Sequence, residues 1–416
     1  VEICEDLWAP IPPSSFLTLG GATILLNLSA SNELVSKAEY RKALLCTQAS
    51  RSLCAYAYAS AGVGESTQDA LFGGHSMICE RSAVLAEQQP FQRDPSLIIA
   101  DADMELLIIE RRKQTSYMAQ AKETLPPLRE IPIHLPEQKL DQLLRKINPY
   151  PFVPANDAQL SQRCHTIFQI QANALAKRME HTHAESMVIG ISGGLDSTLA
   201  LLVAVEACRI LGLDRKTILG VTMPGFGTSD RTYHNALSFM EALGIRQKEI
   251  SIVPSVLQHF SDIGHDPKRH NVTYENAQAR ERTQILMDFA NMENGLVIGT
   301  GDLSELALGW ATYNGDHMSM YGVNAGVPKT LVKVLVKWAA ETGNIPETAK
   351  AILLDILDTP ISPELLPPDQ EGNIDQKTED LVGPYQLHDF FLYYVVRFGF
   401  TPTKIYYLAQ QAFGQQ

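Results

Sequence analysis

The segment 192–197, Ser-Gly-Gly-Leu-Asp-Ser, constrains the fold of this chain more than any other stretch. It follows the apolar run 187–191 and precedes an apolar stretch from about Thr198 to Leu211, so the predicted order is strand, glycine turn, helix. Backbone N–H groups at such a turn and at a helix N-terminus favour a bound anion. The two glycines carry no Cβ, so an anion can approach the backbone closely.

The side chains of the same segment add donors and a charge. Ser192 and Ser197 offer hydroxyl groups, and Asp196 offers a carboxylate able to hold Mg²⁺. The Gly-x-x-x-x-Gly-Lys-Ser/Thr pattern of the Walker phosphate loop does not occur in the chain. The segment therefore predicts a phosphate site of another type. The alternative is an ordinary strand-to-helix turn.

The charge and the apolar runs exclude several kinds of partner. The net charge of −13 argues against general binding to nucleic acid, which needs a basic face. No apolar run reaches the ~18 residues of a membrane span, so we expect no membrane partner. The six cysteines show no Cys-x-x-Cys spacing, and so few cysteines in a chain of 416 residues suggest a reducing, cytoplasmic location.

The chain divides into three blocks, and the predicted fold class is α/β. In residues 1–113, short strands are predicted at 1–4, 23–28, 75–79 and 97–100. One long helix is predicted at 37–60. Residues 114–155 are rich in proline and read as a connector.

In the third block, residues 156–416, strands alternate with helices, the strands being predicted at 187–191, 217–222, 247–252 and 295–299. This alternation predicts a doubly wound parallel sheet that binds ligands beyond the carboxyl ends of its strands.

Four further segments of the third block carry polar groups at places where ligands bind. The glycines and hydroxyls of 223–230 suit an adenosine, and the arginines Arg280 and Arg282 open a helix where they can clamp an anion. The segment 299–305 follows the last strand and places Glu305 in a first helical turn. A polar stretch at 376–380 predicts a mobile loop whose Lys377 closes over phosphate.

These motifs resemble those of a known family. The segment 192–197 resembles the pyrophosphate loop of the N-type ATP pyrophosphatases, which split ATP into AMP and pyrophosphate. Taken with 299–305 and with 315–330, it resembles the NAD synthetases over about residues 156–416. The resemblance implies that the carboxylate of deamido-NAD attacks the α-phosphate of ATP, and that ammonia then displaces AMP.

The resemblance also implies roles for individual residues. Those expected to bind ATP and pyrophosphate are Ser192, Gly193, Gly194, Asp196, Ser197 and Thr300. Those expected to bind deamido-NAD are Asn276, Arg280, Asp302, Glu305 and Lys377. Asp196 and Glu305 are the expected Mg²⁺ ligands. Each has a plainer alternative, such as a surface ion pair for Arg280 or a helix N-terminal acid for Asp302 and Glu305.

The first block resembles a nitrilase-type amidase. Cys4 lies at the end of a predicted strand in Ile-Cys-Glu-Asp-Leu-Trp, a segment similar to the cysteine elbow of that superfamily. Glutamine-dependent NAD synthetases carry such a domain, in which the cysteine attacks the glutamine amide and frees ammonia. The glutamate and lysine partners of this cysteine are expected to precede Val1, and the chain reads as truncated at both ends. The alternative for Cys4 is a small buried thiol.

The fold expected from both resemblances is a partial nitrilase-like α/β sandwich followed by a doubly wound ATP pyrophosphatase domain, in an enzyme that forms homo-oligomers. Three other functions stay open from the residues. They are a different pyrophosphate-loop amidotransferase, a non-catalytic nucleotide-binding module, and an amidase with an accessory nucleotide domain.

Overall fold

The computed structural model describes residues 1–66, 69–122, 126–136, 142–153, 157–343, 345–359, 365 and 378–414. By their internal contacts these residues form two compact units. Unit 1 holds residues 1–148 and 394–416, and unit 2 holds residues 149–393. The units differ from the predicted blocks because 394–416 belongs with the first unit, and the block boundaries themselves stay predictions. Within the described ranges, every helix is too short or too polar for a membrane span.

Unit 1 is built on one mixed sheet of five strands in the order β1-β2-β3-β4-β5. The first three strands are parallel, and the last two are antiparallel to their neighbours. The strands are β1 (Glu2–Ile3), β2 (Ile24–Ser29), β3 (Ala55–Ser60), β4 (Ser76–Glu80) and β5 (Ala83–Gln88). The helices are η1 (Cys4–Trp8), α1 (Pro13–Leu19), α2 (Lys37–Arg51), α3 (Met104–Lys113), α4 (Thr115–Gln120) and α15 (Pro402–Phe413).

Two predictions for this unit are wrong. The helix predicted over 37–60 ends at Arg51, and residues 55–60 form β3 instead. The sequence Ala-Tyr-Ala-Tyr-Ala-Ser alternates with the period of a strand, and both Tyr56 and Tyr58 lie in the core. The strand predicted at 97–100 does not form: in the described structure this stretch is irregular and joins neither sheet.

Unit 2 is built on a fully parallel sheet in the order β10-β9-β6-β7-β8. Its strands are β6 (Ser186–Gly190), β7 (Ile218–Thr222), β8 (Arg246–Glu249), β9 (Gly295–Gly299) and β10 (Tyr321–Gly322). Its helices are α5 (Asp157–Thr182), α6 (Leu195–Leu211), η2 (Arg215–Thr217), α7 (Asp230–Leu243), α8 (Val253–Ile263), α9 (Val272–Met292), α10 (Leu303–Leu308), α11 (Lys329–Thr342), α12 (Glu347–Leu357), α13 (Thr378–Val382) and α14 (Tyr385–Leu392). A π-helical turn, η3 (Tyr393–Phe398), crosses the boundary between the units.

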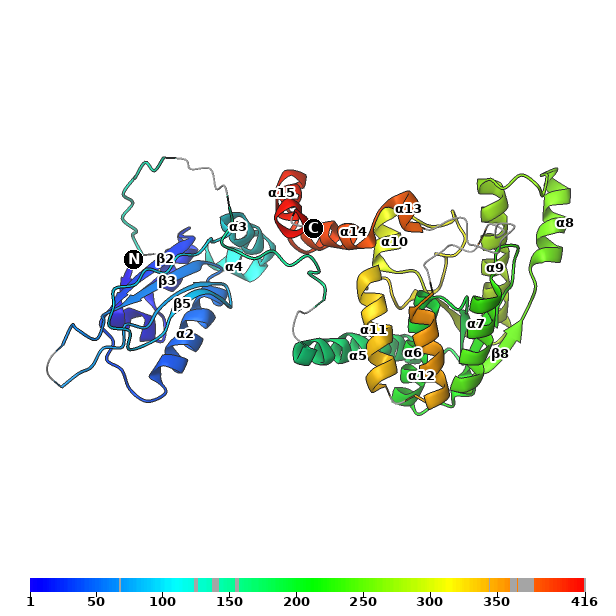
Figure 1. The fold of residues 1–416 in the computed structure, drawn as a ribbon, viewed down its shortest axis with the longest axis horizontal. Coiled ribbons are helices and arrows are strands. Elements are labelled where there is room, and N and C mark those ends of the chain that lie inside the picture. Colours follow the sequence, from blue (N-terminus) through cyan, green and yellow to red (C-terminus); the bar gives the residue numbers. More distant parts are fainter. Residues whose placement is uncertain are drawn as a thin grey trace. The chain divides into compact units, whose positions relative to one another are not determined.

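Helices cover both faces of this second sheet. Met187 and Ile189 of β6 pack into a core with α5, α6, α7, α11 and α12, whereas Val188 points into a second core with α8 and α9. Figure 1 shows α5, α6, α11 and α12 together on one side of unit 2, with α8 and α9 away from them. The alternation follows from the period of two along a strand. The predicted α/β class and the doubly wound parallel sheet are therefore confirmed.

One buried arginine ties unit 1 together. Arg111 on α3 is 8% exposed and donates to four backbone oxygens. Its Nε reaches Leu53 O at 3.0 Å, and its Nη2 reaches Ala22 O at 2.6 Å. The other two acceptors are Gly21 O and Ser52 O. These carbonyls belong to the loops that lead into β2 and β3, so the guanidinium fixes where both strands begin.

We predict that Arg111→Lys loosens the loops before β2 and β3, because an ammonium cannot replace the planar fork of donors. A buried carbonyl left without a donor costs about 1–3 kcal/mol. Hydrogen–deuterium exchange read by mass spectrometry should be faster at 20–26 and 52–57 in this variant. Arg112→Lys is the matched control, because Arg112 is exposed. Equal exchange in both variants would contradict the prediction.

Candidate functional site

The candidate site lies where the order of the strands reverses in unit 2. From β6 the chain runs outward through β7 to β8, and then returns to the other side of β6 to form β9 and β10. The loops after β6 and β9 therefore leave the carboxyl ends of two neighbouring parallel strands in opposite directions, which is the place where open α/β sheets generally bind their ligands. The segment 192–197 leaves β6, and 300–305 leaves β9, so the fold brings these two predicted segments together.

The loop after β6 has its predicted form. Gly193 has a φ of +86°, and a Cβ at this position would lie 2.2 Å from the backbone oxygen of Thr232 on α7. Only glycine fits there, for reasons of both backbone conformation and space. The Ser192 and Ser197 hydroxyls lie 3.2 Å apart, and Gly194 N–H donates to Ser192 Oγ at 3.2 Å.

The N-terminus of α6 is open to a ligand. Its N-cap is Gly194, which has no side chain to accept a hydrogen bond from the first turn. The first N–H groups of an α-helix lack partners within the helix, and the dipole of this 17-residue helix favours an anion there, with the Asp196 carboxylate already in the first turn. By contrast, a serine caps α7 and an aspartate caps α10. The uncapped end supports the predicted phosphate site at this loop.

Three carboxylates meet beside the loop. Each of Asp196, Asp302 and Glu305 has an oxygen within 4.8 Å of an oxygen of the other two, and we call them the carboxylate triad. Asp196 lies in the first turn of α6, and Glu305 lies in the first turn of α10. Asp302 is the N-cap of α10, accepts the Glu305 N–H at 2.9 Å, and is fully buried.

The ammonium of Lys329 forms an ion pair with each carboxylate of the triad. Its Nζ lies 2.7 Å from Asp196 Oδ2, 2.6 Å from Asp302 Oδ2 and 2.7 Å from Glu305 Oε1. The lysine side chain is 3% exposed. The three carboxylates raise the pKa of Lys329, which keeps the ammonium charged despite its burial. Removing one partner of a buried ion pair typically costs about 3–5 kcal/mol, so the ammonium is essential for this arrangement.

Burial and mutual repulsion make the triad carboxylates weaker acids. Burial, with the neighbouring charges of Glu305 and Asp302, raises the pKa of Asp196 to about 7, although Lys329 opposes the shift. Burial also raises the pKa of Glu305, with Asp302 adding to the effect and Lys329 again opposing it. One ammonium does not fully compensate three carboxylates, and such a site favours additional positive charge.

Asn324 holds the two loops at a fixed separation. This fully buried residue follows β10, and its Nδ2 donates to Asp196 O at 2.9 Å and to Thr300 O at 3.0 Å. Gln171 on α5 donates in turn to Asn324 Oδ1 at 3.1 Å. Thr300 therefore takes part in the site through its backbone.

Asp389 on α14 ties the helices of the site together. Its carboxylate is 2% exposed and accepts Ser304 Oγ at 2.5 Å, Thr330 N at 2.9 Å and Thr330 Oγ1 at 2.6 Å. Ser304 Oγ accepts the backbone N–H of Lys329 at 2.9 Å. The carboxylate therefore caps the start of α11, whose own N-cap is a proline without a side-chain acceptor.

The remaining expected ligands of deamido-NAD are less closely placed. Asn276 and Arg280 lie on α9, and Arg280 is exposed with its Nε donating to Tyr313 O at 3.0 Å. Asp302 is inside the triad, where its burial favours a structural role over direct contact with a dinucleotide. Lys377 lies outside the described residues. The dinucleotide-binding roles of all these residues stay predictions.

The donor set of the triad fits a divalent cation. Carboxylate oxygens are the preferred ligands of Mg²⁺. In the described structure, Asp196 Oδ1 is buried without a hydrogen-bond partner, so this oxygen is available to a cation. The side chains of Asp196 and Glu305, the two expected ligands, are each about one-quarter exposed, so an ion can reach them from solvent.

Cys4 lies in unit 1 in a strained backbone conformation. Its φ is +45°, a left-handed value that costs a residue with a Cβ about 1–3 kcal/mol. It is the first residue of η1 and directly follows β1, so the chain turns at the cysteine, and the side chain is partly exposed. Its backbone oxygen accepts Asn27 Nδ2 at 3.5 Å. This geometry is typical of a nucleophile at a strand end, and the nucleophilic role stays a prediction.

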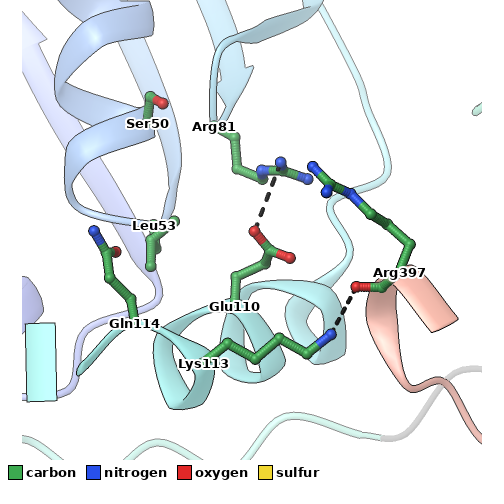
Figure 2. A pocket seen from close by; sticks show the side chains of 7 residues that line it. All are labelled: Ser50, Leu53, Arg81, Glu110, Lys113, Gln114 and Arg397. Atoms are coloured by element: carbon green, nitrogen blue, oxygen red, sulfur yellow. Dashed lines mark hydrogen bonds and ion pairs between the residues drawn. The ribbon is translucent and has the colours of Figure 1, made fainter. Parts of the chain in front are cut away.

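A pocket in unit 1 is separate from these residues. Its volume is about 480 Å³, and its lining includes the cations of Arg81, Lys113 and Arg397. Figure 2 shows the Arg81 and Arg397 guanidinium groups facing one another across it. Arg81 lies 3.7 Å from Glu110, and Lys113 Nζ donates to Arg397 O at 2.6 Å. None of the predicted site residues lines this pocket.

Comparisons with known proteins identify the family of the chain. The family model described as NAD synthase matches residues 167–398, which is more than half of the chain. The chain belongs to the NAD synthase family.

Relatives extend the likeness into unit 1. The glutamine-dependent NAD(+) synthetase of Mycobacterium leprae is 44% identical over 99% of this chain and 62% of its own length. That of Thermotoga maritima is 30% identical over 97% of this chain and 66% of its own length. The chain thus spans about 62% of the length of the first of these relatives. A solved glutamine-dependent NAD+ synthetase from Acinetobacter baumannii, in complex with ADP, covers 98% of this chain and 65% of that chain at 21% identity, with a TM-score of 0.44.

Three residues that the structure brings into the site had no predicted role: Lys329, Asn324 and Asp389. Two of them, Asn324 and Lys329, lie within 315–330, a segment that carries the family resemblance. Lys329 also leaves a physical signal. Lys329 is the first residue of α11, where the helix dipole disfavours a cation by about 0.3–1 kcal/mol. A lysine directly after Pro328 and before an apolar helix is therefore unusual unless anions surround it. Asp389 left no such signal, because its partners lie 85 and 59 residues away in the chain.

We predict that Gly193→Ala abolishes pyrophosphate binding at the loop 192–197. The Cβ of the alanine would collide with the backbone oxygen of Thr232, and the φ at position 193 suits only glycine. Calorimetric titration with pyrophosphate and Mg²⁺ measures the effect. Gly212→Ala is the matched control: Gly212 also has a left-handed φ, of +66°, but faces open space at the far end of α6. Its substitution should cost about 1 kcal/mol of stability and leave binding unchanged. Retained binding in Gly193→Ala would refute the prediction.

We predict that Asp389→Asn loosens the starts of α10 and α11. The amide presents a donor where the carboxylate accepts three hydrogen bonds, and an unsatisfied buried group costs about 1–3 kcal/mol. Amide exchange at 303–306 and 329–332 should accelerate. In the control Asp355→Asn, the ion pair lost is with Arg231 at the surface, which is worth about 0–1 kcal/mol, and exchange at those segments should not change. Unchanged protection in Asp389→Asn would show that the cap is dispensable.

Proposed function

We propose that this chain carries the synthetase part of a glutamine-hydrolysing NAD synthetase. One observation carries the proposal. The loop 192–197, with the uncapped start of α6, lies beside the carboxylate triad at the place where the order of the strands reverses, in a chain of the NAD synthase family. The reaction is the ATP-dependent adenylation of deamido-NAD and its amidation by ammonia. The products are NAD, AMP and pyrophosphate.

The site residues then divide the work by position. Ser192, Gly193, Gly194 and Ser197, with the N-terminus of α6, hold the β- and γ-phosphates of ATP. This placement directs the α-phosphate toward the carboxylate of the nicotinic acid ring. Little covalent chemistry falls to the protein, whose task is to align the two reactants and to stabilise the charge that grows on the departing pyrophosphate.

Asp196 and Glu305 would hold Mg²⁺ when it is bound. The ion supplies neutralisation of the phosphate oxygens, as a Lewis acid. Asp302 and Asn324 keep the two carboxylate-bearing loops in place, because one caps α10 and the other bridges the loops through their backbone. The second reaction step needs ammonia as a free base, because ammonium has no lone pair with which to attack.

Cys4 is proposed as the nucleophile that releases ammonia from glutamine. A general base takes the thiol proton, the sulfur attacks the side-chain amide, and the same group returns the proton to the nitrogen, so that the C–N bond breaks, ammonia leaves and a thioester remains. Water then hydrolyses the thioester to glutamate and frees the thiol. The strained turn at Cys4 supports this role, since such strain persists at functional sites. A homo-oligomeric state and a cytoplasmic location remain predictions of the sequence.

The other candidate functions differ from the proposed one in the products that an assay would detect. Another pyrophosphate-loop amidotransferase would ignore deamido-NAD as acceptor, and a non-catalytic module would bind ATP without turnover. The complete protein should convert deamido-NAD and ATP to NAD with either ammonium or glutamine, releasing AMP. Release of ADP, or no turnover with all substrates and Mg²⁺ present, would overturn the proposal.

We predict a division of labour between two variants of the complete protein. Asp196→Asn should abolish NAD formation with either nitrogen source, because it removes a metal ligand at the phosphates. Cys4→Ala should abolish only the glutamine-driven reaction. Cys46→Ala is the control, since Cys46 is also a partly exposed thiol of unit 1. A chromatographic assay of NAD checks all three. Loss of ammonium-driven synthesis in folded Cys4→Ala would contradict the division.

A further inference from the structure

The carboxylate triad holds a cation that belongs to the chain itself. The Lys329 ammonium lies 2.6–2.7 Å from one oxygen of each triad member, so it occupies the centre of the oxygens that a metal ion would need. Mg²⁺ binds oxygen at about 2.0–2.1 Å. An ammonium and a divalent ion cannot both lie at that centre, because their charges repel and their contact distances overlap.

The charges show that the lysine is a poorer partner than a metal ion. Three carboxylates face one ammonium, and Asp196 Oδ1 stays buried without a hydrogen bond in the described structure. A divalent ion would compensate more of this charge and would also use the free oxygen. The ammonium thus keeps the carboxylates together without satisfying them fully.

The backbone of Lys329 is anchored independently of its head group. The backbone N–H donates to Ser304 Oγ, and the helix start is held by Asp389. The four-carbon side chain has several rotatable bonds beyond that anchor. The centre of the Tyr385 ring lies 5.5 Å from the ammonium, and the ammonium contacts Asp196, which belongs to the loop 192–197.

We propose that Lys329 and a divalent cation occupy the carboxylate triad in turn. Lys329 holds the triad together before the metal binds, and the arriving metal displaces the ammonium toward the phosphate loop. This inference rests on the proposed function for the presence of a metal. It adds that metal entry frees a positive charge beside the phosphates, so that metal and anion binding favour one another.

Manganese titration followed by electron paramagnetic resonance tests the exchange, with no nucleotide present. Lys329→Met removes the competing ammonium and should bind Mn²⁺ at least tenfold more tightly than the wild-type chain. Lys333→Met is the matched control, because Lys333 is an exposed lysine one turn further along α11, and its affinity should equal that of the wild type. Asp196→Asn should weaken binding, which places the ion on the triad.

Unchanged or weaker Mn²⁺ binding in Lys329→Met would overturn the proposal, as would a failure of both proteins to bind the ion. A second measurement needs no variant, in case Lys329→Met does not fold. Lys329 is nearly inaccessible in the triad, so acetylation of the wild-type chain should modify it several-fold faster when Mn²⁺ is added, relative to Lys333. No change in that ratio would equally overturn the exchange.

These readouts are independent of catalysis. Absence of NAD formation in the complete protein would refute the proposed function and leave the metal titration to stand. Normal NAD formation with equal Mn²⁺ affinities would refute the exchange alone.

Discussion

The ion pairs of Lys329 are the interaction on which the rest of the site depends. The three carboxylates of the triad cannot lie together in a buried site without a compensating charge, because desolvation and mutual repulsion both oppose their approach. The ammonium provides that charge from a third element, α11, and so joins the carboxyl ends of β6 and β9 to the helix layer above them. The hydrogen bonds of Asn324 and Asp389 then fix the backbones that carry these charges.

Much of unit 2 was predictable because its signals are local. A parallel strand buried on both faces is a short apolar run, and the strand at 187–191 stands next to a glycine turn and a long apolar helix. The α/β alternation predicted a doubly wound parallel sheet that binds ligands beyond the carboxyl ends of its strands, but the order of the strands, and with it the meeting of 192–197 and 299–305, comes from the structure. The error over 37–60 also has a local cause: the short turn at 52–54 contains no glycine or proline to mark the end of the helix.

The rest of the site depends on contacts that no local pattern encodes. Asp389 reaches Ser304 and Thr330 across long separations in the chain, and a lone aspartate in a helix reads as a surface residue. Lys329 is unusual as a cation at a helix start, but the carboxylates that surround it come from distant parts of the chain. The pattern predicted which residues carry the chemistry, whereas their supporting partners are chosen by packing in three dimensions.

The close approach of Gly193 to Thr232 limits how the protein can change its length. The clash that a Cβ would cause is with a backbone oxygen, so the identity of the Thr232 side chain does not relieve it. The first turn of α7 therefore packs directly against the loop 192–197. Helix α7 is itself bound to α12, since Arg231 and Asn235 both contact Asp355. Insertions or deletions between β7 and the first turn of α7 would displace this packing contact. Length variation among homologues should accordingly avoid the segment between Thr222 and Asp230.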